Sequence, residues 1–207
     1  IRKIDNITKQ VSTFAGNNSI GHIDGVGTEA TFNFITAIVI DTNDNFLYVS
    51  DNDTITDRCL IRKISTLTRE VTTLFDSDQN TNVSFSNITA IAIDPFSSYL
   101  LIADTNRLYK FELLSNDELN LVQGNLELIS GAADNTPGNV DSPNGGLINA
   151  RFNNICGIFI DYNNEFALIS DTGNHVIKKL YIKNFVNPTI LTLTGGVSSA
   201  QDTPEGS

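Results

Sequence analysis

The sequence predicts an all-β fold of repeated four-stranded antiparallel units, and three observations carry this prediction. Segments of 17 residues align without gaps at Ile35–Asp51, Ile88–Asp104 and Ile155–Asp171. Each segment contains two apolar runs separated by a short polar turn, which is the pattern of a β-hairpin. No segment sustains an apolar period of 3.6 residues over three turns, so we expect no substantial helix.

The first run of each hairpin reads Ile-x-x-Ile-x-Ile-Asp and is apolar at nearly every position. Such a run is typical of a strand that is buried on both faces. The turns that follow are rich in Asn, Asp, Ser and Pro, which favour tight turns. The second runs read FLYVS, YLLIA and FALIS.

Two further strands follow each hairpin. The third strands are expected at Ile61–Ile64, Leu108–Phe111 and Val176–Leu180. The fourth strands are expected at Val71–Asp76, Leu126–Gly131 and Ile190–Gly195, and the chain opens with a similar pair at Ile1–Ile4 and Val11–Gly16. Four-stranded units repeated 53 and then 67 residues apart indicate a β-propeller, because radial stacking buries both faces of each sheet.

We expect residues 1–207 to form a single partial propeller domain of about three and a half blades. Residues 1–16 supply two blade strands. Complete blades cover roughly 17–76, 77–131 and 132–195, and 196–207 resembles the start of a further blade. Since such an arc does not close, it is expected to belong to a larger ring of about six blades. The first strands are expected to be innermost and to line the channel.

The repeat resembles the NHL-repeat family. Asn174 and His175, followed by Ile177-Lys178-Lys179, match the motif that names the family, and residues 24–32 match its Asp-Gly and Ala-x-Phe linker. The linker match is partial at 141–152, and the middle unit lacks the His. The resemblance implies a propeller that binds a protein partner. It also implies an alternative, because some related propellers are lyases or lactonases that hold zinc or calcium.

Five polar residues are interpreted as a structural repeat motif: Asp51, Asp104, Asp171, Asn174 and His175. The three Asp recur at one position of the aligned segments, and Asn174 and His175 follow the last of them. The three Asp side chains end the second strands, where a carboxylate can accept N–H groups from the turn that follows. His175 is expected to pack or to form hydrogen bonds. Because the Asp recurs in every unit, we favour a structural role over a catalytic or metal-binding cluster and expect no catalytic residue.

No metal site or cofactor is expected. The two histidines, His22 and His175, fall in different units, whereas zinc chemistry needs about three protein ligands. The segment 41–45 (DTNDN) resembles the start of a calcium loop, but Phe46 stands where the loop requires Gly, so we expect a hairpin turn.

The two cysteines are expected to be free thiols. Cys156 falls in a first strand, where burial is expected, and Cys59 falls in a surface connection. Free thiols slightly favour an intracellular location.

The net charge of −11 argues against nucleic acid and against anionic membrane surfaces as partners. No apolar run is long enough to span a bilayer. The connections expected at one end of the blades carry six candidate partner-binding residues: Asp24, Glu29, Asp53, Asp57, Asp134 and Asp141.

Two interpretations of this acidic face stay open. It is either a solvated rim that favours solubility or a docking surface for a basic protein partner. The resemblance to the NHL-repeat family implies a non-catalytic protein–protein interaction or scaffold module, and we expect this function. The alternative is a metal-dependent lyase or lactonase-type propeller whose ligands lie partly outside this sequence.

Overall fold

The computed structural model describes residues 1–53, 55–79, 85–113, 126–142, 149–183 and 189–195. Within these residues, no helix is long and apolar enough to cross a membrane. The strands of the first half are β1 (Arg2–Ile4), β2 (Val11–Thr13), β3 (Gly25–Val26), β4 (Phe34–Ile40), β5 (Phe46–Asn52), β6 (Cys59–Ser65) and β7 (Glu70–Asp76). Those of the second half are β8 (Ile88–Ile93), β9 (Tyr99–Asp104), β10 (Arg107–Glu112), β11 (Leu126–Ser130), β12 (Ile155–Ile160), β13 (Phe166–Asp171), β14 (Val176–Tyr181) and β15 (Ile190–Gly195).

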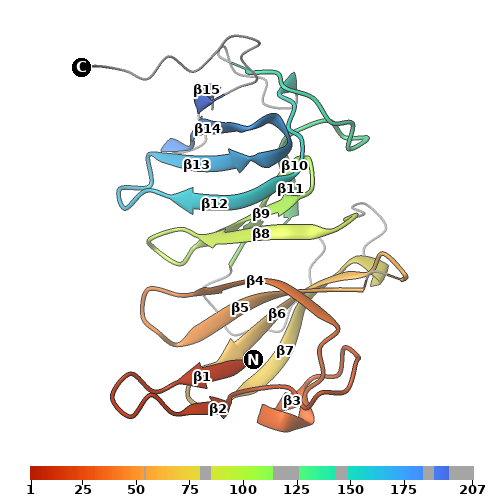
Figure 1. Cartoon of the computed structure of the whole chain (residues 1–207), viewed down its shortest axis with the longest axis vertical. Helices are drawn as coiled ribbons and strands as arrows, with labels where there is room; N and C mark the ends of the chain where they lie inside the picture. The colour runs from red at the N-terminus through yellow and green to blue at the C-terminus, as the bar shows by residue number, and fades with distance from the viewer. Residues whose placement is uncertain (54, 80–84, 114–125, 143–148, 184–188, 196–207) are drawn as a thin grey trace, which may run out of the picture.

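These strands form four antiparallel sheets that follow one another along the long axis of the molecule (Figure 1). Three of them are meanders, in the orders β4-β5-β6-β7, β8-β9-β10-β11 and β12-β13-β14-β15. The short strand β3 extends the first meander beyond β7, and β1 pairs with β2 alone. The all-β propeller architecture is therefore confirmed, whereas the expected further blade at 196–207 lies outside the described residues.

The three aligned segments adopt one structure. Residue pairs Ile35↔Asp51, Ile88↔Asp104 and Ile155↔Asp171 face each other across the first two strands, and each first strand has an irregularity directly after that pair. Strand β8 packs between β4 and β12. The three first strands are thus the neighbouring inner strands of successive sheets, as the sequence predicts.

The expectation that every first strand is buried on both faces is wrong for two of the three. Strand β8 is well covered, and Ile91 is only 5% exposed. By contrast, Ile38 on β4 is 49% exposed and Phe159 on β12 is 59% exposed. The reason is that β8 has a complete sheet on each side, while β4 and β12 each have one among the described residues.

The core consists of layers between neighbouring sheets. Phe75 at the end of β7 meets Phe85 edge to face with ring centroids 5.2 Å apart, and Phe85 meets Tyr109 of the next sheet at 5.0 Å. A second layer joins the last two sheets through residues such as Leu108, Phe152 and Leu180. Because each layer needs both of its sheets, neighbouring blades stabilise one another.

An aspartate closes each hairpin between a first and a second strand. Asp41 Oδ1 accepts the N–H groups of Asn45 and Phe46 at 2.7 and 3.0 Å, so the segment 41–45 is the hairpin turn expected from the sequence. Asp94 and Asp161 form the same pair of bonds in the other blades. Each of these aspartates directly follows a first strand, and the repeat supplies one at each turn.

Both cysteine placements differ from the expectation. Cys59 begins β6 and is 1% exposed, since the strand starts earlier than the sequence suggests and the side chain joins the core layer of Phe75. Cys156 is exposed because it lies on β12, which has a neighbouring complete sheet on only one side.

Candidate functional site

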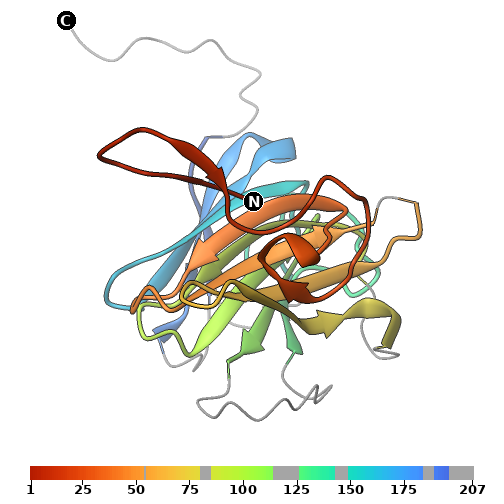
Figure 2. The same ribbon diagram turned by 90° about the horizontal axis from the view of Figure 1, so that it is seen from below.

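The loops of the blades separate into two ends of the molecule. The turns of the hairpins β4–β5, β8–β9 and β12–β13 lie together at the left of both views, and the loop between β5 and β6 lies at the right (Figures 1 and 2). In a meander, the connections from second to third strands and the linkers between blades share one end. We call this right-hand end the loop end. Of the candidate partner-binding residues, Asp53, Asp57 and Asp134 belong to its connections. The expectation is wrong for Glu29, because its linker runs along the outer edge of β7, where Val26 pairs with Glu70 and Gly27 N–H donates to the carbonyl of Arg69 near the opposite end.

The three Asp residues that end the second strands are fully buried, with 0% exposure. In each, Oδ1 accepts backbone N–H groups from the segment that leads into the first strand, not from the turn that follows as expected. The donors are Asn33 for Asp51 (2.7 Å), Ser86 and Asn87 for Asp104 (2.8 Å each), and Asn153 for Asp171 (2.7 Å). Each carboxylate therefore ties a linker to the end of its own hairpin.

The second carboxylate oxygen of each Asp meets a side chain. Asp51 Oδ2 accepts Arg62 Nη1 at 2.8 Å, and Asp171 Oδ2 accepts Asn174 Nδ2 at 2.8 Å. Asp104 Oδ2 pairs with the guanidinium of Arg107. With both oxygens engaged inside the blade, these carboxylates stabilise the fold and are poorly placed to act on an external ligand.

Asn174 and His175 occupy different environments. Asn174 Nδ2 donates to Asp171 and also to the carbonyl of Gly138 at 2.7 Å, which joins the linker to the third strand. His175 is exposed, has a left-handed backbone with φ of 57°, and its backbone N–H donates to Thr172. The sequence predicted that His175 packs or forms hydrogen bonds; its exposure contradicts packing, and the hydrogen bond shown here is that of its backbone N–H.

Asp24 and Asp141 are held by the same set of donors in two different blades. Asp24 Oδ1 accepts Arg62 Nη2 at 2.8 Å and Thr73 Oγ1 at 2.9 Å, while its Oδ2 accepts Thr73 N–H at 3.0 Å. For Asp141, Lys178 Nζ donates to Oδ1 at 2.6 Å, and Thr192 donates through Oγ1 at 2.9 Å and through N–H at 2.7 Å. We call this arrangement of a third-strand cation, a fourth-strand Thr and a linker Asp the cation–Thr site.

Burial and these hydrogen bonds act in opposite directions on Asp141. Burial would raise its pKa, but the bonds from Lys178 and Thr192 outweigh that effect and hold the pKa below the ordinary value of 3.8. Asp24 and Asp141 are therefore parts of the blade framework as well as members of the predicted acidic face.

The other four acidic candidates have no buried Arg or Lys as a partner among the described residues, and three of them, Glu29, Asp57 and Asp134, are exposed. Asp53 Oδ1 accepts Ile55 N–H at 2.9 Å, and this bond lowers the pKa of Asp53. Hydrogen bonds from Thr136 lower the pKa of Asp134, which is exposed. Glu29 and Asp57 are also exposed, and no cation of the described residues forms an ion pair with either of them.

His22 lies between two of the aspartates, which the sequence did not suggest. Its Nδ1 is 3.1 Å from Asp51 Oδ2, and its Nε2 is 3.7 Å from Asp53 Oδ2. The Nε2 atom is buried and has no hydrogen-bond partner among the described residues. Elsewhere too, the described part of the chain contains no group of three or more His, Cys, Asp or Glu side chains arranged for a metal ion.

Sequence reasoning missed two buried cations that hold the linker aspartates, Arg62 and Lys178. Arg62 and Lys178 both have 0% exposure, although charged side chains are rarely buried without partners. A signal was present, because both occupy the same position of their third strands and both face a Thr on the fourth strand, in the pairs Arg62↔Thr73 and Lys178↔Thr192.

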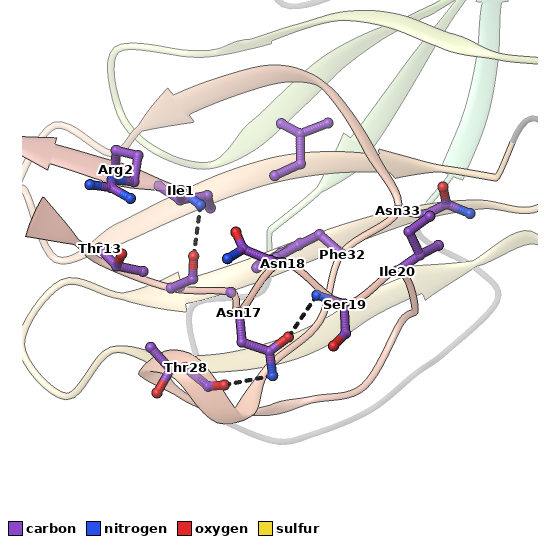
Figure 3. A pocket seen from close by; sticks show the side chains of 13 residues that line it. Ile1, Arg2, Thr13, Asn17, Asn18, Ser19, Ile20, Thr28, Phe32 and Asn33 are labelled. Carbon is purple, nitrogen blue, oxygen red and sulfur yellow. Dashed lines mark hydrogen bonds between the residues drawn. The ribbon is translucent and has the colours of Figure 1, made fainter.

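A pocket of about 410 Å³ lies beside β1 and β2 (Figure 3). Arg2 and Thr13 lie next to each other at one of its edges, and Asn17, Asn18 and Ser19 line it from the linker. Asn17 Nδ2 donates to the carbonyl of Thr28 at 2.9 Å, and its Oδ1 accepts Ser19 N–H at 3.0 Å. These two bonds hold the linker segment that forms one wall of the pocket. The pocket therefore combines one cation with amide and hydroxyl groups.

No family model and no curated protein matches the chain. Solved structures with a similar fold do match. A periplasmic gluconolactonase of Pseudomonas aeruginosa is 10% identical with a TM-score of 0.54, over 98% of this chain and 50% of that one. An auxiliary nutrient binding protein of Bacteroides thetaiotaomicron is 12% identical with a TM-score of 0.51, over 95% and 53%.

A protein assigned provisionally as a 6-phosphogluconolactonase, from Bacteroides uniformis, is 14% identical with a TM-score of 0.50, over 82% and 45% of the two chains. The chain has a β-propeller fold. It spans about half the length of these neighbours, and identities this low support the fold alone. The finer resemblance to NHL repeats is not confirmed.

Proposed function

We propose that this propeller segment is a non-catalytic binding module that docks a basic segment of a protein partner at its loop end. The observation that carries the proposal is the difference among the six acidic candidates. Asp24 and Asp141 are held by buried cations, whereas Asp57 and Asp134 are exposed in connections of the loop end. Exposed carboxylates on loops of a rigid scaffold suit a positively charged partner.

The charge balance of the loop end supports the same proposal. Arg58 forms ion pairs with Asp76 at 2.7 Å and with Asp78 at 3.5 Å, and Arg107 is paired with buried Asp104. These cations are therefore occupied locally and leave Asp57 uncompensated. A basic peptide would meet net negative charge there, which speeds association and makes binding sensitive to salt.

A pair of double variants tests the proposal. The first changes Asp57→Asn and Asp134→Asn at the loop end. Asn suits the left-handed backbone of Asp57, which has φ of 57°. The control changes Asp44→Asn and Glu70→Gln, which are exposed residues at the opposite end, and Asp44 is also left-handed with φ of 59°. Both variants have the same net charge.

The probe is a decalysine peptide, titrated into each protein by calorimetry at low and at high salt. We expect the loop-end variant to bind several-fold more weakly than the control variant, with the difference shrinking at high salt. Equal binding by the two variants would contradict docking at the loop end and leave the solvated acidic rim as the account of these residues.

A second candidate, a lactonase-type enzyme, is favoured by the comparisons. Two of the structural neighbours are a gluconolactonase and a provisional 6-phosphogluconolactonase. The pocket beside β1 also carries amide, hydroxyl and guanidinium groups that can bind a hydroxylated ligand. The residues described here do not supply a metal site, so we assign no metal-dependent step to them.

The enzyme candidate is tested with glucono-1,5-lactone, following the protons that its hydrolysis releases at neutral pH. Hydrolysis above the uncatalysed rate that is lost in an Arg2→Gln variant would establish the lactonase candidate and overturn the non-catalytic proposal. A rate equal to the buffer control would exclude this lactone as a substrate of the chain.

A further inference from the structure

His22 connects the linker of the first complete blade, residues 17–33, to the end of β5. Its side chain is 10% exposed, and the ring lies between two carboxylates, with Nδ1 at 3.1 Å from Asp51 Oδ2 and Nε2 at 3.7 Å from Asp53 Oδ2. The Nε2 atom is buried and has no hydrogen-bond partner among the described residues. Because these residues already enclose the atom, a further polypeptide segment has no access to it.

The contacts of the ring assign the proton of its neutral form to Nδ1. Asp51 is paired with Arg62, and an ionised carboxylate offers only acceptors, so Nδ1 donates to it. The lone pair of Nε2 then faces the carboxylate of Asp53, which has no proton to donate. A buried acceptor without a donor is unfavourable, and a neighbouring negative charge adds to the cost. Protonation of Nε2 removes both defects, because the atom becomes a donor that faces Asp53.

Carboxylates outnumber cations around the ring. The charged groups are Asp24 of the linker, Asp51 on β5, Asp53 directly after β5, Asp76 at the end of β7, Arg62 on β6 and Arg58 directly before β6. Arg62 is bound to Asp24 and Asp51, and Arg58 is bound to Asp76. No Arg or Lys of the described residues pairs with Asp53, so an imidazolium would supply the cation that this carboxylate lacks.

The blade that ends with β15 has neither member of this pair. Asn139 occupies the position of His22, two residues before the linker Asp, and its Oδ1 accepts Lys178 Nζ at 2.9 Å. Gly173 occupies the position of Asp53, two residues after the buried Asp of the second strand. The blade fold therefore forms without the histidine and without the carboxylate, which indicates a role specific to the first complete blade.

Asp53 also shapes the connection between β5 and β6. Its Oδ1 accepts the N–H groups of Ile55 at 2.9 Å and Thr56 at 3.4 Å, and its own N–H donates to the carbonyl of Arg58 at 2.7 Å. An ion pair between His22 and Asp53 would therefore join the linker to this connection.

We propose that His22 is a proton-binding switch, whose imidazolium binds Asp51 and Asp53 together and thereby fastens the connection between β5 and β6 to the linker. Unprotonated, the ring is bound to Asp51 alone. Histidine is the side chain that ordinarily changes charge between about pH 5 and pH 8, so a fall in pH closes the switch. Closure requires Nε2 and Asp53 Oδ2 to approach by about 1 Å from their separation of 3.7 Å.

The test compares His22→Asn with His175→Asn, which removes the other histidine of the chain. Asn suits both positions, since Asn139 has the place of His22 in its own blade and His175 has a left-handed backbone with φ of 57°. Because the imidazolium gains a partner on folding, its stabilising contribution is present at low pH and is lost as the pH rises. From about pH 8 down to about pH 5.5, the melting temperatures of the unmodified chain and of His175→Asn should gain about 2–4 °C relative to His22→Asn.

A second variant keeps the ring and removes the carboxylate that Nε2 faces. Asp53→Asn retains an oxygen for the Ile55 N–H, and its amide offers a donor to unprotonated Nε2, so the gain on acidification should be lost. In nuclear magnetic resonance spectra over the same pH range, the amides of residues 53 and 55–58 should shift in the unmodified chain and in His175→Asn, but not in His22→Asn.

Three results would each overturn the proposal: parallel pH curves for the unmodified chain and His22→Asn, an equal change in the two histidine variants, or a full gain in Asp53→Asn. The measurements need no bound peptide. Their outcome is therefore separate from that of the test for docking at the loop end.

Discussion

Arg62 and Asp51 form an ion pair in which both side chains have 0% exposure, with Nη1 and Oδ2 at 2.8 Å. Arg62 also reaches Asp24 and the carbonyls of Ile23 and Thr31. One guanidinium thereby joins the third strand, the end of the second strand and the linker. Breaking such a pair on one side leaves a buried charge without its partner.

Replacement of Arg62 by Met should therefore lower the free energy of unfolding by about 3–5 kcal/mol. The control is Lys63→Met on the same strand, where the side chain is partly exposed over the ring of Phe46 and a loss of about 1 kcal/mol or less is expected. Urea unfolding measures both. If the two variants lost similar stability, the ion pair would not have the structural role described here.

The pH dependence of stability should follow the aspartates with lowered pKa values. For Asp141 the folded pKa lies below the unfolded value of 3.8, so its stabilising contribution is fully present above that value and is lost as the pH falls through the folded pKa. Melting temperatures measured from about pH 6 down to about pH 3 should fall for the unmodified protein. The fall should be shallower for Asp141→Asn, and an identical slope in the two proteins would refute this assignment.

The two thiols should differ sharply in reactivity. Burial raises the pKa of Cys59 to about 12, and the residue is 1% exposed, whereas Cys156 is exposed. Because the thiolate is the reactive form, a chromogenic disulfide reagent should titrate one thiol rapidly in the native protein and the second only after unfolding. The rapid reaction should disappear in Cys156→Ala. Two rapid thiols would show that the β6 end opens readily.

The loss of stability caused by a charged residue on an inner strand should depend on whether the strand has a complete sheet on one side or on both. Ile91→Asp on β8 should destabilise the protein by several kcal/mol, because the residue is 5% exposed between two sheets. Ile38→Asp on β4 should cost much less, since that side chain is 49% exposed. Thermal melting of the two variants decides the matter, and equal losses would mean that β4 is as enclosed as β8.

Much of the fold follows from local sequence. The aligned hairpins were predictable because the alternation of apolar runs and turn residues is encoded within each segment, and the Asp at each turn closes it locally. The exposure of β4 and β12 was not predictable in this way, since it depends on which sheets stand beside them. The same holds for Cys156. Its strand was predicted correctly, but its exposure depends on the sheets beside that strand.

For the polar residues too, the sequence predicted which positions recur but not which contacts their side chains form. The recurrence of Asp51, Asp104 and Asp171 pointed to a repeated motif, but their hydrogen bonds run to the preceding linker, which is distant in sequence. The cation–Thr sites were missed because a charged residue in a strand is usually solvated, and only the register of the third and fourth strands reveals Arg62 and Lys178 as buried. The role of the six acidic face residues stays a prediction.

The most direct measurement of where this propeller binds is a nuclear magnetic resonance titration of the isotopically labelled chain with the decalysine peptide. Docking at the loop end predicts that amide shifts change in residues 53–58 and 132–137, around Asp57 and Asp134. The hairpin turns 41–45, 94–98 and 161–165 at the opposite end should stay unchanged. Shifts concentrated at those turns, or spread evenly over both ends, would contradict the proposed binding face.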